Sequence, residues 1–439
     1  MGSYVPTTAA EREQMLAQVG VKSLNDLYAA VPQEMFLHNG LNLPEGLSEL
    51  EVREKVTDLA EKNKVFKTVL RGAGSYRHFI PAVVKSITSR EELVTCYTPY
   101  QAEISQGVLQ GTFEFQTMIC ELTGMDVANA SHYDGATAAA ETIPMCKERK
   151  RNVAYVSETT NPQVIEVMKT YCFASNTELH VVPAKDGKTD AEALKAALGD
   201  NAACFYVQQP NFFGQIEDAA ALGEITHAAG AKFVMGVNPI ACALLPTPRE
   251  VGADVAVGDG QPLGLDTAFG GPYLGFMATT SAMTRKLPGR IVGETKDVDG
   301  KTGYVLTLSA REQHIRREKA SSNICSNQAL CAFTAGVYMS AMGEDGMKQC
   351  ARLCTSKAHY LASELEKIGC KLKYTGEFFH EFVTETACPN CRKKILDALA
   401  EKNILGGAEV DGGILWCVTE LVSKEKLDEV VAIVKEVQG

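Results

Sequence analysis

Short apolar runs alternate with helical stretches between about residues 95 and 330, and this alternation constrains the fold more than any other feature of the chain. Each run ends in polar or turn-forming residues, and stretches of helical spacing such as NPQVIEVMKTYCF separate the runs. Repeated strand–helix–strand units predict a mainly parallel sheet covered on both faces, which binds ligands beyond the carboxyl ends of its strands. The predicted strands are NVAYVS (152–157), ELHVVP (178–183), AACFYVQQP (202–210), AKFVMGV (231–237) and ADVAVG (253–258).

The chain changes character on either side of this block. Residues 1–70 read as short helices joined by loops, and Thr8 and Ser48 each open a capping-box pattern with a Glu three residues later. The punctuated stretch 32–47 carries apolar residues that cannot form a core alone, and such segments usually wrap another surface. From about residue 345 a helix, a strand near 377–385, a second helix, the run ILWCVTE and a closing helix follow. We therefore expect a 1–70 N-terminal helical arm, a 71–340 large α/β domain and a 341–439 small C-terminal α+β domain.

Composition excludes several classes of protein. Of 439 residues, 45% are hydrophobic and 22% are charged, as in soluble globular proteins. No apolar run approaches the roughly 20 residues of a membrane span, and no secretory signal opens the sequence, so we expect no membrane partner. The net charge of −11 argues against nucleic acid as a partner, because non-specific binding needs a basic surface.

Cysteine usage indicates a cytoplasmic protein. The 14 cysteines are scattered singly, mostly within apolar segments, which is typical of buried thiols in a reducing compartment. Cys388-Pro-Asn-Cys391 is the exception. This CxxC fits a redox pair or half of a zinc site, but no second CxxC or His pair accompanies it, so a structural or incidental pair is the favoured interpretation.

Five motifs in order resemble one family. The longest is YTPYQAEISQGVLQGTFEFQTMICELTGMDVANASHYDGATAAAE (97–141), and the chain resembles the P-protein of the glycine cleavage system, glycine decarboxylase, along almost its whole length. The match is to the first subunit of the two-subunit form. The resemblance implies a fold type I pyridoxal 5′-phosphate (PLP) transferase-like fold, an architecture that the predicted parts also suit. The other four motifs are GAGSYRHFIPAVV (72–84), QQPNFFGQIED (208–218), VGDGQPLG (257–264) and SSNICSNQAL (321–330).

The family's cofactor lysine is missing from this chain. PLP catalysis needs a lysine amine to form the internal aldimine, and the resemblance assigns that lysine to the second subunit. No lysine occurs between Lys232 and Lys286, and alignment places Pro262, give or take one residue, at the lysine position. The carboxylate that would hold the pyridine nitrogen protonated falls on Met235 or Asn238, neither of which is charged. The resemblance thus implies that this chain has no catalytic residue. It also implies that a partner subunit binds PLP at a site which the two subunits share.

Polar groups in the first motif are the candidates for that shared site. The resemblance implies that this chain supplies part of the wall, where uncharged side chains would bind the glycine carboxylate and shape a passage for a lipoyl arm. The alternative is that the tyrosines simply pack at the subunit interface. The substrate-binding candidates are Tyr97, Thr98, Tyr100, Gln101 and Gln106.

A second set of candidates lies near the interface or the cofactor. The turn SHYDGATAAAE (131–141) matches the turn that holds the cofactor phosphate in active relatives, and here it is interpreted as a relic of that site. A lone histidine such as His132 is more often structural than catalytic. Arg77 and the cluster Arg311, Arg316 and Arg317 suit an anion, although a solvated helix face explains the cluster equally well. The full set is Arg77, His78, His132, Tyr133, Asp134, Ser322 and Asn323; no metal site is predicted.

These observations predict a subunit of an aminomethyl-transferring glycine dehydrogenase. The implied partners are a PLP-bearing second subunit (two copies of each chain), glycine, and the H-protein, whose lipoyl group accepts the aminomethyl group as CO2 is released. One alternative is a scaffold or regulator of the same fold. Another is an autonomous PLP enzyme using Lys286 or Lys319, but Lys286 follows the glycine-rich turn instead of preceding it.

Overall fold

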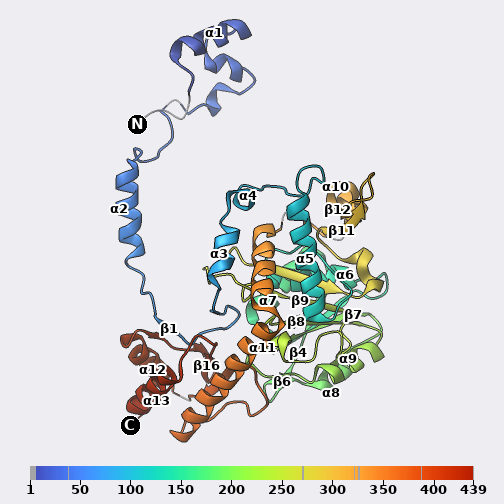
Figure 1. Cartoon of the computed structure of the whole chain (residues 1–439), viewed down its shortest axis with the longest axis vertical. Helices are drawn as coiled ribbons and strands as arrows, with labels where there is room; N and C mark the ends of the chain where they lie inside the picture. The colour runs from blue at the N-terminus through green and yellow to red at the C-terminus, as the bar shows by residue number, and fades with distance from the viewer. Residues whose placement is uncertain are drawn as a thin grey trace. The chain divides into compact units, whose positions relative to one another are not determined.

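The computed structural model describes residues 6–37, 39–268, 271–320, 322–324, 327–386 and 388–438. The chain forms two compact units, Met1–Lys64 and Val65–Gly439 (Figure 1). The first unit ends close to residue 70, where the sequence predicts the end of the arm. Among the helices in the described ranges, none is both long enough and apolar enough to cross a membrane.

Two capped helices make up most of the first unit. Helix α1 (Ala9–Val19) begins after Thr8, which exchanges hydrogen bonds with Glu11, and α2 (Glu49–Ala60) begins after Ser48 in the same way with Glu51. Both predicted capping boxes are confirmed, and each satisfies backbone N–H groups that the first turn leaves free. Neither helix buries a residue, and no other described residue of this unit is buried, so the part that the structure describes has no core of its own. Two 3-10 turns, η1 (Leu24–Tyr28) and η2 (Gln33–Met35), lie between them.

A seven-stranded sheet organises the second unit. Strands β4, β3, β7, β8 and β9 run parallel, while β10 pairs antiparallel with both β9 and β2. All five predicted strands are present, and the mainly parallel sheet is confirmed. In sheet order the strands are β2 (Val127–Ala128), β10 (Gly275–Thr279), β9 (Val255–Asp259), β8 (Lys232–Val237), β7 (Ala202–Gln209), β3 (Val153–Ser157) and β4 (Glu178–Val182).

Both faces of this sheet are buried. Successive side chains of a strand point to opposite faces, so Phe233 and Met235 join one apolar cluster while Val234 joins the other. Helices α6 and α7 cover the face of Val234; α5, α9 and the first part of α11 cover the opposite face. The helices of this part are α5 (Gln106–Thr123), α6 (Gly135–Cys146), α7 (Pro162–Ala174), α8 (Ala191–Ala197) and α9 (Ala219–Ala228).

Helix boundaries follow local chemistry. Asp134 caps α6, and Asn161 caps α7 just ahead of Pro162 at the first helical position. Helix α5 ends at Gly124 with φ +70°, a conformation that glycine adopts without a steric penalty. These caps place the N-termini of α6 and α7 beside the carboxyl ends of the strands.

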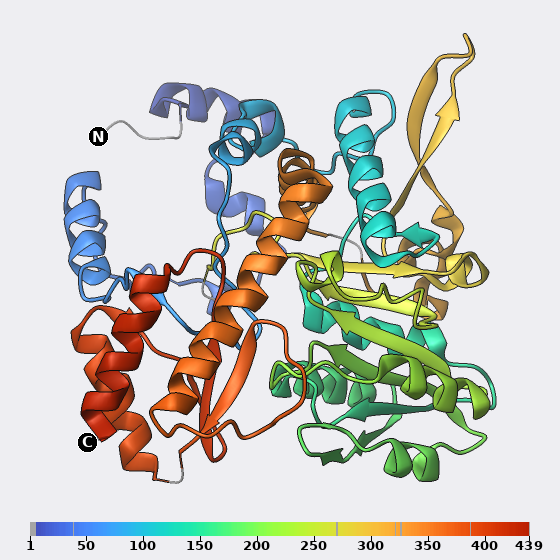
Figure 2. The ribbon, with the colours of Figure 1, turned by 60° about the horizontal axis from the view of Figure 1, so that its bottom comes forward.

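Helix α11 (Ala329–Lys367) connects the sheet to the C-terminal part of the same unit (Figure 2). Its helical geometry is interrupted at Gly343, near the predicted domain boundary at 340. Beyond it, a three-stranded antiparallel sheet and two helices enclose a third apolar cluster that contains Trp416. These elements are β13 (Glu381–Glu385), β16 (Gly413–Cys417), β15 (Ala408–Val410), α12 (Pro389–Glu401) and α13 (Lys424–Gln438).

Shorter elements complete the second unit. Strand β1 pairs parallel with β14, which joins the start of the unit to its C-terminal part. Strands β11 and β12 form a hairpin. The remaining elements are β1 (Thr68–Val69), β14 (Ile404–Leu405), β11 (Ile291–Lys296), β12 (Thr302–Thr307), β5 (Ala184–Lys185), β6 (Lys188–Thr189), α3 (Ala82–Thr88), α4 (Glu91–Val94), α10 (Gln313–Arg316), η3 (Ala241–Ala243), η4 (Ser281–Lys286), η5 (Ser309–Arg311) and η6 (Arg317–Lys319).

Candidate functional site

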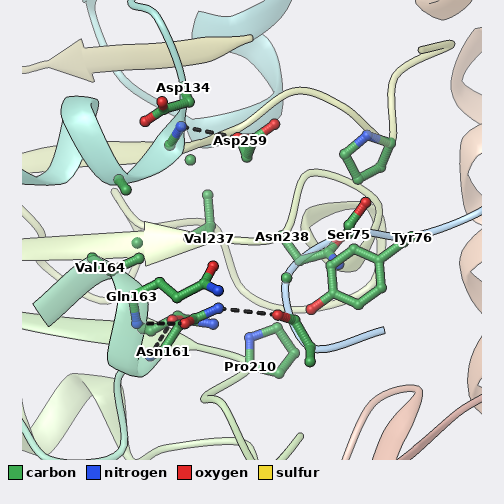
Figure 3. A pocket seen from close by; sticks show the side chains of 18 of the residues that line it. Ser75, Tyr76, Asp134, Asn161, Gln163, Val164, Pro210, Val237, Asn238 and Asp259 are labelled. Carbon is green, nitrogen blue, oxygen red and sulfur yellow. Dashed lines mark hydrogen bonds between the residues drawn. The ribbon is translucent and has the colours of Figure 1, made fainter. Parts of the chain in front are cut away.

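A cavity of about 520 Å³ lies at the carboxyl ends of the parallel strands. Residues directly after β7, β8 and β9 line it, together with the first turns of α6 and α7 (Figure 3). The segment 73–76 and the start of β13 close it from the C-terminal part. This is where the sheet topology predicts a ligand site. Its polar lining includes Ser75, Tyr76, Asp134, Asn161, Gln163, Gln208, Asn238, Asp259, Tyr273, His380 and Glu381.

Two carboxylates fill the N-terminus of α6 at this cavity. One Asp134 oxygen accepts hydrogen bonds from the Thr137 N–H and hydroxyl, both at 2.7 Å. Asp259 accepts from the Gly135 N–H and the Gln261 N–H, both at 2.9 Å. Burial raises the pKa of Asp259 to about 6, although these backbone hydrogen bonds oppose the rise. Two of the N–H groups that an anion would use at this helix end, those of Gly135 and Thr137, are therefore already bonded to carboxylates of the chain itself.

A third carboxyl group enters the cavity from β13. Glu381 accepts hydrogen bonds from the Ala73 N–H at 2.7 Å and the Tyr76 hydroxyl at 2.8 Å. Burial raises the pKa of Glu381 to about 7, and the same two hydrogen bonds oppose that effect. Its neighbour His380 is buried, which lowers its pKa to about 3. Glu381 therefore holds the segment 73–76 against the C-terminal part.

The predicted substrate-binding loop lies outside this cavity. Tyr97 is 89% exposed, Thr98 has φ +52°, and Gln101 is exposed. The Tyr100 hydroxyl donates a short hydrogen bond to Asn327, and the Arg290 guanidinium lies 4.5 Å from the centre of its ring. None of the five predicted residues is among the described residues of the cavity wall.

Gln106 joins this loop to the β11–β12 hairpin. Its side-chain amide donates to the Tyr304 carbonyl and accepts from the Tyr304 N–H, both at 2.8 Å. The loop is therefore held by polar contacts with residues 290, 304 and 327, which the sequence did not link to it.

The predicted interface and cofactor-proximal residues are dispersed. Asp134 lines the cavity; Arg77 and Asn323 are exposed, and Tyr133 is 38% exposed. Ser322 accepts a hydrogen bond from the Ile324 N–H at 3.1 Å.

The two predicted histidines are both buried. His132 is fully buried on the strand side of the turn before α6, which lowers its pKa to about 3, so it is uncharged at neutral pH. His78 lies 2.8 Å from a Glu420 oxygen. Burial alone would lower the pKa of His78, but hydrogen bonds with Cys350 and Glu420 raise it to about 9.

Comparison with known proteins decides the family. The model of the family described as glycine cleavage system P-protein matches residues 2–434. The chain belongs to this family. A "probable glycine dehydrogenase (decarboxylating) subunit 1" of Desulfitobacterium hafniense is 48% identical over 447 residues, 99% of this chain and 100% of that protein. Its counterpart in Moorella thermoacetica is 49% identical over 442 residues, 99% of each chain.

Solved structures agree with this family membership. A crystal structure of glycine decarboxylase (P-protein) of the glycine cleavage system, in inhibitor-bound form, is 41% identical with a TM-score of 0.92, covering 99% of this chain and 100% of that one. A sphingosine-1-phosphate lyase of Burkholderia pseudomallei is 12% identical with a TM-score of 0.69, covering 91% and 92% of the two chains, and shows the fold alone. The predicted resemblance and the fold type I transferase-like architecture are both confirmed.

The cavity of this P-protein family member does not fit PLP. No lysine is among the described residues that line it. Pro262, the aligned lysine position, faces the cavity, whereas Gln261 is buried and bridges to the segment beside it. The Gln261 amide accepts from the Tyr76 N–H and donates to the Tyr76 and Leu265 carbonyls, each at 2.8 Å. The carboxylates at α6 would also repel a phosphate, so the site lacks both the amine and the anion cradle.

Met235 and Asn238, the two alternatives for the residue that would face the pyridine nitrogen, lie in different surroundings. Met235 is buried in the core, while Asn238 lines the cavity. The Asn238 side-chain oxygen accepts from the Ile240 N–H at 2.9 Å, which starts the turn after β8. An amide used in this way orders the backbone and carries no charge. The cavity of this P-protein family member can therefore supply hydrogen bonds, but no amine nucleophile.

Sequence reasoning missed Asp259 and Glu381. Asp259 directly follows a predicted strand, and a carboxylate at a strand's carboxyl end is a signal that could have found it. Glu381 gives no such signal, because only the tertiary placement of β13 brings it to the cavity.

Proposed function

We propose that this chain is the half of a two-subunit glycine decarboxylase that does not bind PLP. The near relatives are named as subunit 1 of a glycine dehydrogenase (decarboxylating) and match almost end to end. The chain is accordingly an enzyme subunit of the glycine cleavage system, an oxidoreductase. Its partner, in our proposal, is a second subunit that binds PLP, with two copies of each chain.

The reaction of the assembly follows from this assignment. Glycine loses its carboxyl group as CO2, and the aminomethyl group passes to one sulfur of the oxidised lipoyl arm of the carrier H-protein. The other sulfur leaves as a thiol, so the lipoyl disulfide is reduced as the glycine carbon is oxidised. PLP held by the partner would supply the electron sink for the decarboxylation.

The contribution of this chain is a wall of hydrogen-bonding side chains, uncharged apart from Arg290. Tyr100, Arg290 and Asn327 are already in contact at one surface, and Gln106 holds the adjoining hairpin. We infer that this surface faces the partner's site and that Tyr97, Thr98, Tyr100, Gln101 and Gln106 bind glycine or guide the lipoyl arm. Arg77, Tyr133, Ser322 and Asn323 belong, in the same proposal, to the surrounding interface.

One observation carries the proposal: the cavity where this fold would hold its cofactor has Pro262 and a carboxylate-filled helix terminus in place of a lysine and a phosphate cradle. An autonomous PLP enzyme using Lys286 is disfavoured. That side chain is nearly half exposed, lies 3.4 Å from a Glu148 oxygen, and does not line the cavity.

Absorbance spectroscopy with borohydride reduction tests the assignment. The purified chain is mixed with PLP, alone and with the second subunit, and scanned before and after reduction. We expect a reducible aldimine only when the partner is present. PLP covalently trapped on the isolated chain would overturn the proposal. A scaffold role would be shown by a partner that turns over glycine equally well without this chain.

A further inference from the structure

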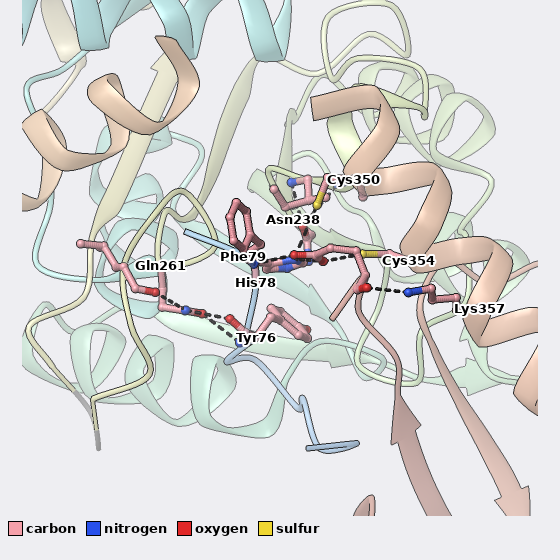
Figure 4. Close-up of polar contacts among 12 residues, drawn as sticks. Tyr76, His78, Phe79, Asn238, Gln261, Cys350, Cys354 and Lys357 are labelled. Carbon is pink, nitrogen blue, oxygen red and sulfur yellow. Dashed lines mark hydrogen bonds and ion pairs between the residues drawn. The ribbon is translucent and has the colours of Figure 1, made fainter. Parts of the chain in front are cut away.

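Four potential metal ligands meet at a buried point beside the cavity, outside the site described above. They are His78, Cys350, Cys354 and Glu420, of which the first three are labelled in Figure 4. His78 lies on the segment before α3, and Glu420 follows β16. The two cysteines occupy positions i and i+4 of α11, so their side chains lie on one helix face, one turn apart. Three separate elements therefore each supply part of the group.

The distances already approach those of a tetrahedral site. One ligand atom from each residue lies within 4.8 Å of all the others. His78 Nδ1 is 2.8 Å from a Glu420 oxygen and 3.7 Å from Cys350 Sγ, and Cys354 Sγ is 3.3 Å from the same Glu420 oxygen. Zinc bonds of about 2.0 Å to nitrogen or oxygen and 2.3 Å to sulfur give tetrahedral edges of about 3.3–3.8 Å. Small side-chain movements would thus suffice to admit an ion.

The donor set selects the ion. Two thiolate sulfurs and an imidazole nitrogen favour Zn²⁺ over Mg²⁺ or Ca²⁺, which prefer oxygen ligands. Both sulfurs are buried, and the side chains of His78 and Glu420 are 2% and 11% exposed. A buried site with four protein ligands is typical of structural zinc, because a catalytic ion keeps an open position.

We propose that His78, Cys350, Cys354 and Glu420 form a structural zinc site. It would tie α11 and the C-terminal part to the segment 72–81, whose residues 73–76 line the cavity. This inference does not depend on the proposed function. It also differs from the sequence expectation, which considered zinc only for Cys388 and Cys391, two exposed residues at the start of α12.

Zinc analysis of the untagged, full-length chain tests the proposal. We expect about one zinc per chain after purification without chelators, and a loss of at least tenfold in a Cys350→Ser/Cys354→Ser variant. The matched control is Cys388→Ser/Cys391→Ser, which removes the exposed thiol pair and should keep its zinc. Reconstitution of the zinc-free chain with Co²⁺ gives a second readout: the intense visible bands of a thiolate-bound tetrahedral ion, absent in the first variant alone.

A second variant protects the test against a folding defect. Glu420→Gln keeps the size of the side chain while removing its charge, and it should weaken zinc binding at least tenfold with an unchanged far-UV circular dichroism spectrum. The proposal is overturned if no zinc binds after reconstitution, or if zinc binding follows the Cys388–Cys391 pair. A disulfide between Cys350 and Cys354 in the chain purified under reducing conditions would overturn it as well.

Discussion

Asp259 shows how one residue can close a cofactor site. Its carboxylate lies where the first N–H of α6 points, and Gly135 fits there only because it has no side chain: a Cβ would stand 2.8 Å from the Cβ of Asp259. The carboxylate is largely enclosed, however, and its desolvation raises its pKa from 3.8 to about 6. The ionised Asp259 carboxylate therefore disfavours an anion at this helix end, but its ionisation lowers the stability of the folded chain.

That cost gives Asp259 a measurable pH dependence. Because its folded-state pKa lies above the unfolded value, its favourable contribution is complete below about pH 4 and is lost as the pH rises through about 6. The rise corresponds to about 3 kcal/mol. We predict that the free energy of unfolding of Asp259→Asn, minus that of wild type, increases by about this amount between pH 4 and pH 8, so that the variant gains stability relative to wild type as the pH rises.

Denaturant unfolding of the variant and of wild type across this pH range measures the difference between their free energies of unfolding. Other titrating groups such as Glu381 are present in both proteins, so their contributions cancel in this difference. A difference that does not change with pH would mean that Asp259 is not a buried titrating group. The absolute stability of the variant is less informative, because asparagine has one acceptor oxygen for two N–H donors and loses a hydrogen bond.

At the scale of elements, the local sequence pattern was sufficient to predict the parallel strands of the sheet but not all the residues that line the cavity. The five parallel strands are near-continuous apolar runs with a turn signal at each end, and both faces of the sheet are buried. Strand β10 was not predicted: it is short, opens with Gly275 and runs antiparallel, so no strand–helix repeat marks it. Alignment placed the lysine position at Pro262, give or take one residue, and the carboxylate position at Met235 or Asn238; Pro262 and Asn238 line the cavity, whereas Glu381 reaches it only through tertiary packing.

The first unit, Met1–Lys64, carries exposed apolar residues that its own fold does not explain. Its helices α1 and α2 bury no residue, and the loop between them carries Met35, Leu37, Leu41 and Leu43, all at least 67% exposed. Apolar side chains in this number are costly in water. We interpret the unit as an arm that covers its apolar residues on the partner subunit.

Removing the arm should therefore weaken assembly. We predict that a chain lacking residues 1–64 keeps the thermal unfolding midpoint of the second unit but binds the partner at least tenfold less tightly, because burying each leucine contributes about 1.5–3 kcal/mol. Analytical ultracentrifugation of the mixed subunits measures the affinity. The full-length variant Leu41→Ser/Leu43→Ser should show the same direction of change. Wild-type affinity in both proteins would refute the wrapping role.

For the whole molecule, two surfaces have to be distinguished. The internal cavity is closed to a cofactor by the chain's own side chains, while the polar surface around Tyr100 is organised by Arg290, Asn327 and the β11–β12 hairpin. A subunit that contributes to catalysis without a cofactor must act through a surface that meets its partner. In our proposal that surface is the one around Tyr100, and the cavity keeps only a structural role.

Tyr100→Phe in the assembled enzyme decides between a catalytic wall and simple interface packing. The change removes the hydroxyl that donates to Asn327 but keeps the ring under Arg290. We predict unchanged complex size and PLP content, with kcat/KM for glycine lowered about tenfold, as expected for the loss of one hydrogen bond to a polar group. Tyr360→Phe is the matched control, because that hydroxyl donates to Asp428 in the C-terminal part and should leave turnover unaffected. Equal turnover in the two variants would assign Tyr100 to packing, since a hydroxyl that binds substrate cannot be removed without loss of activity.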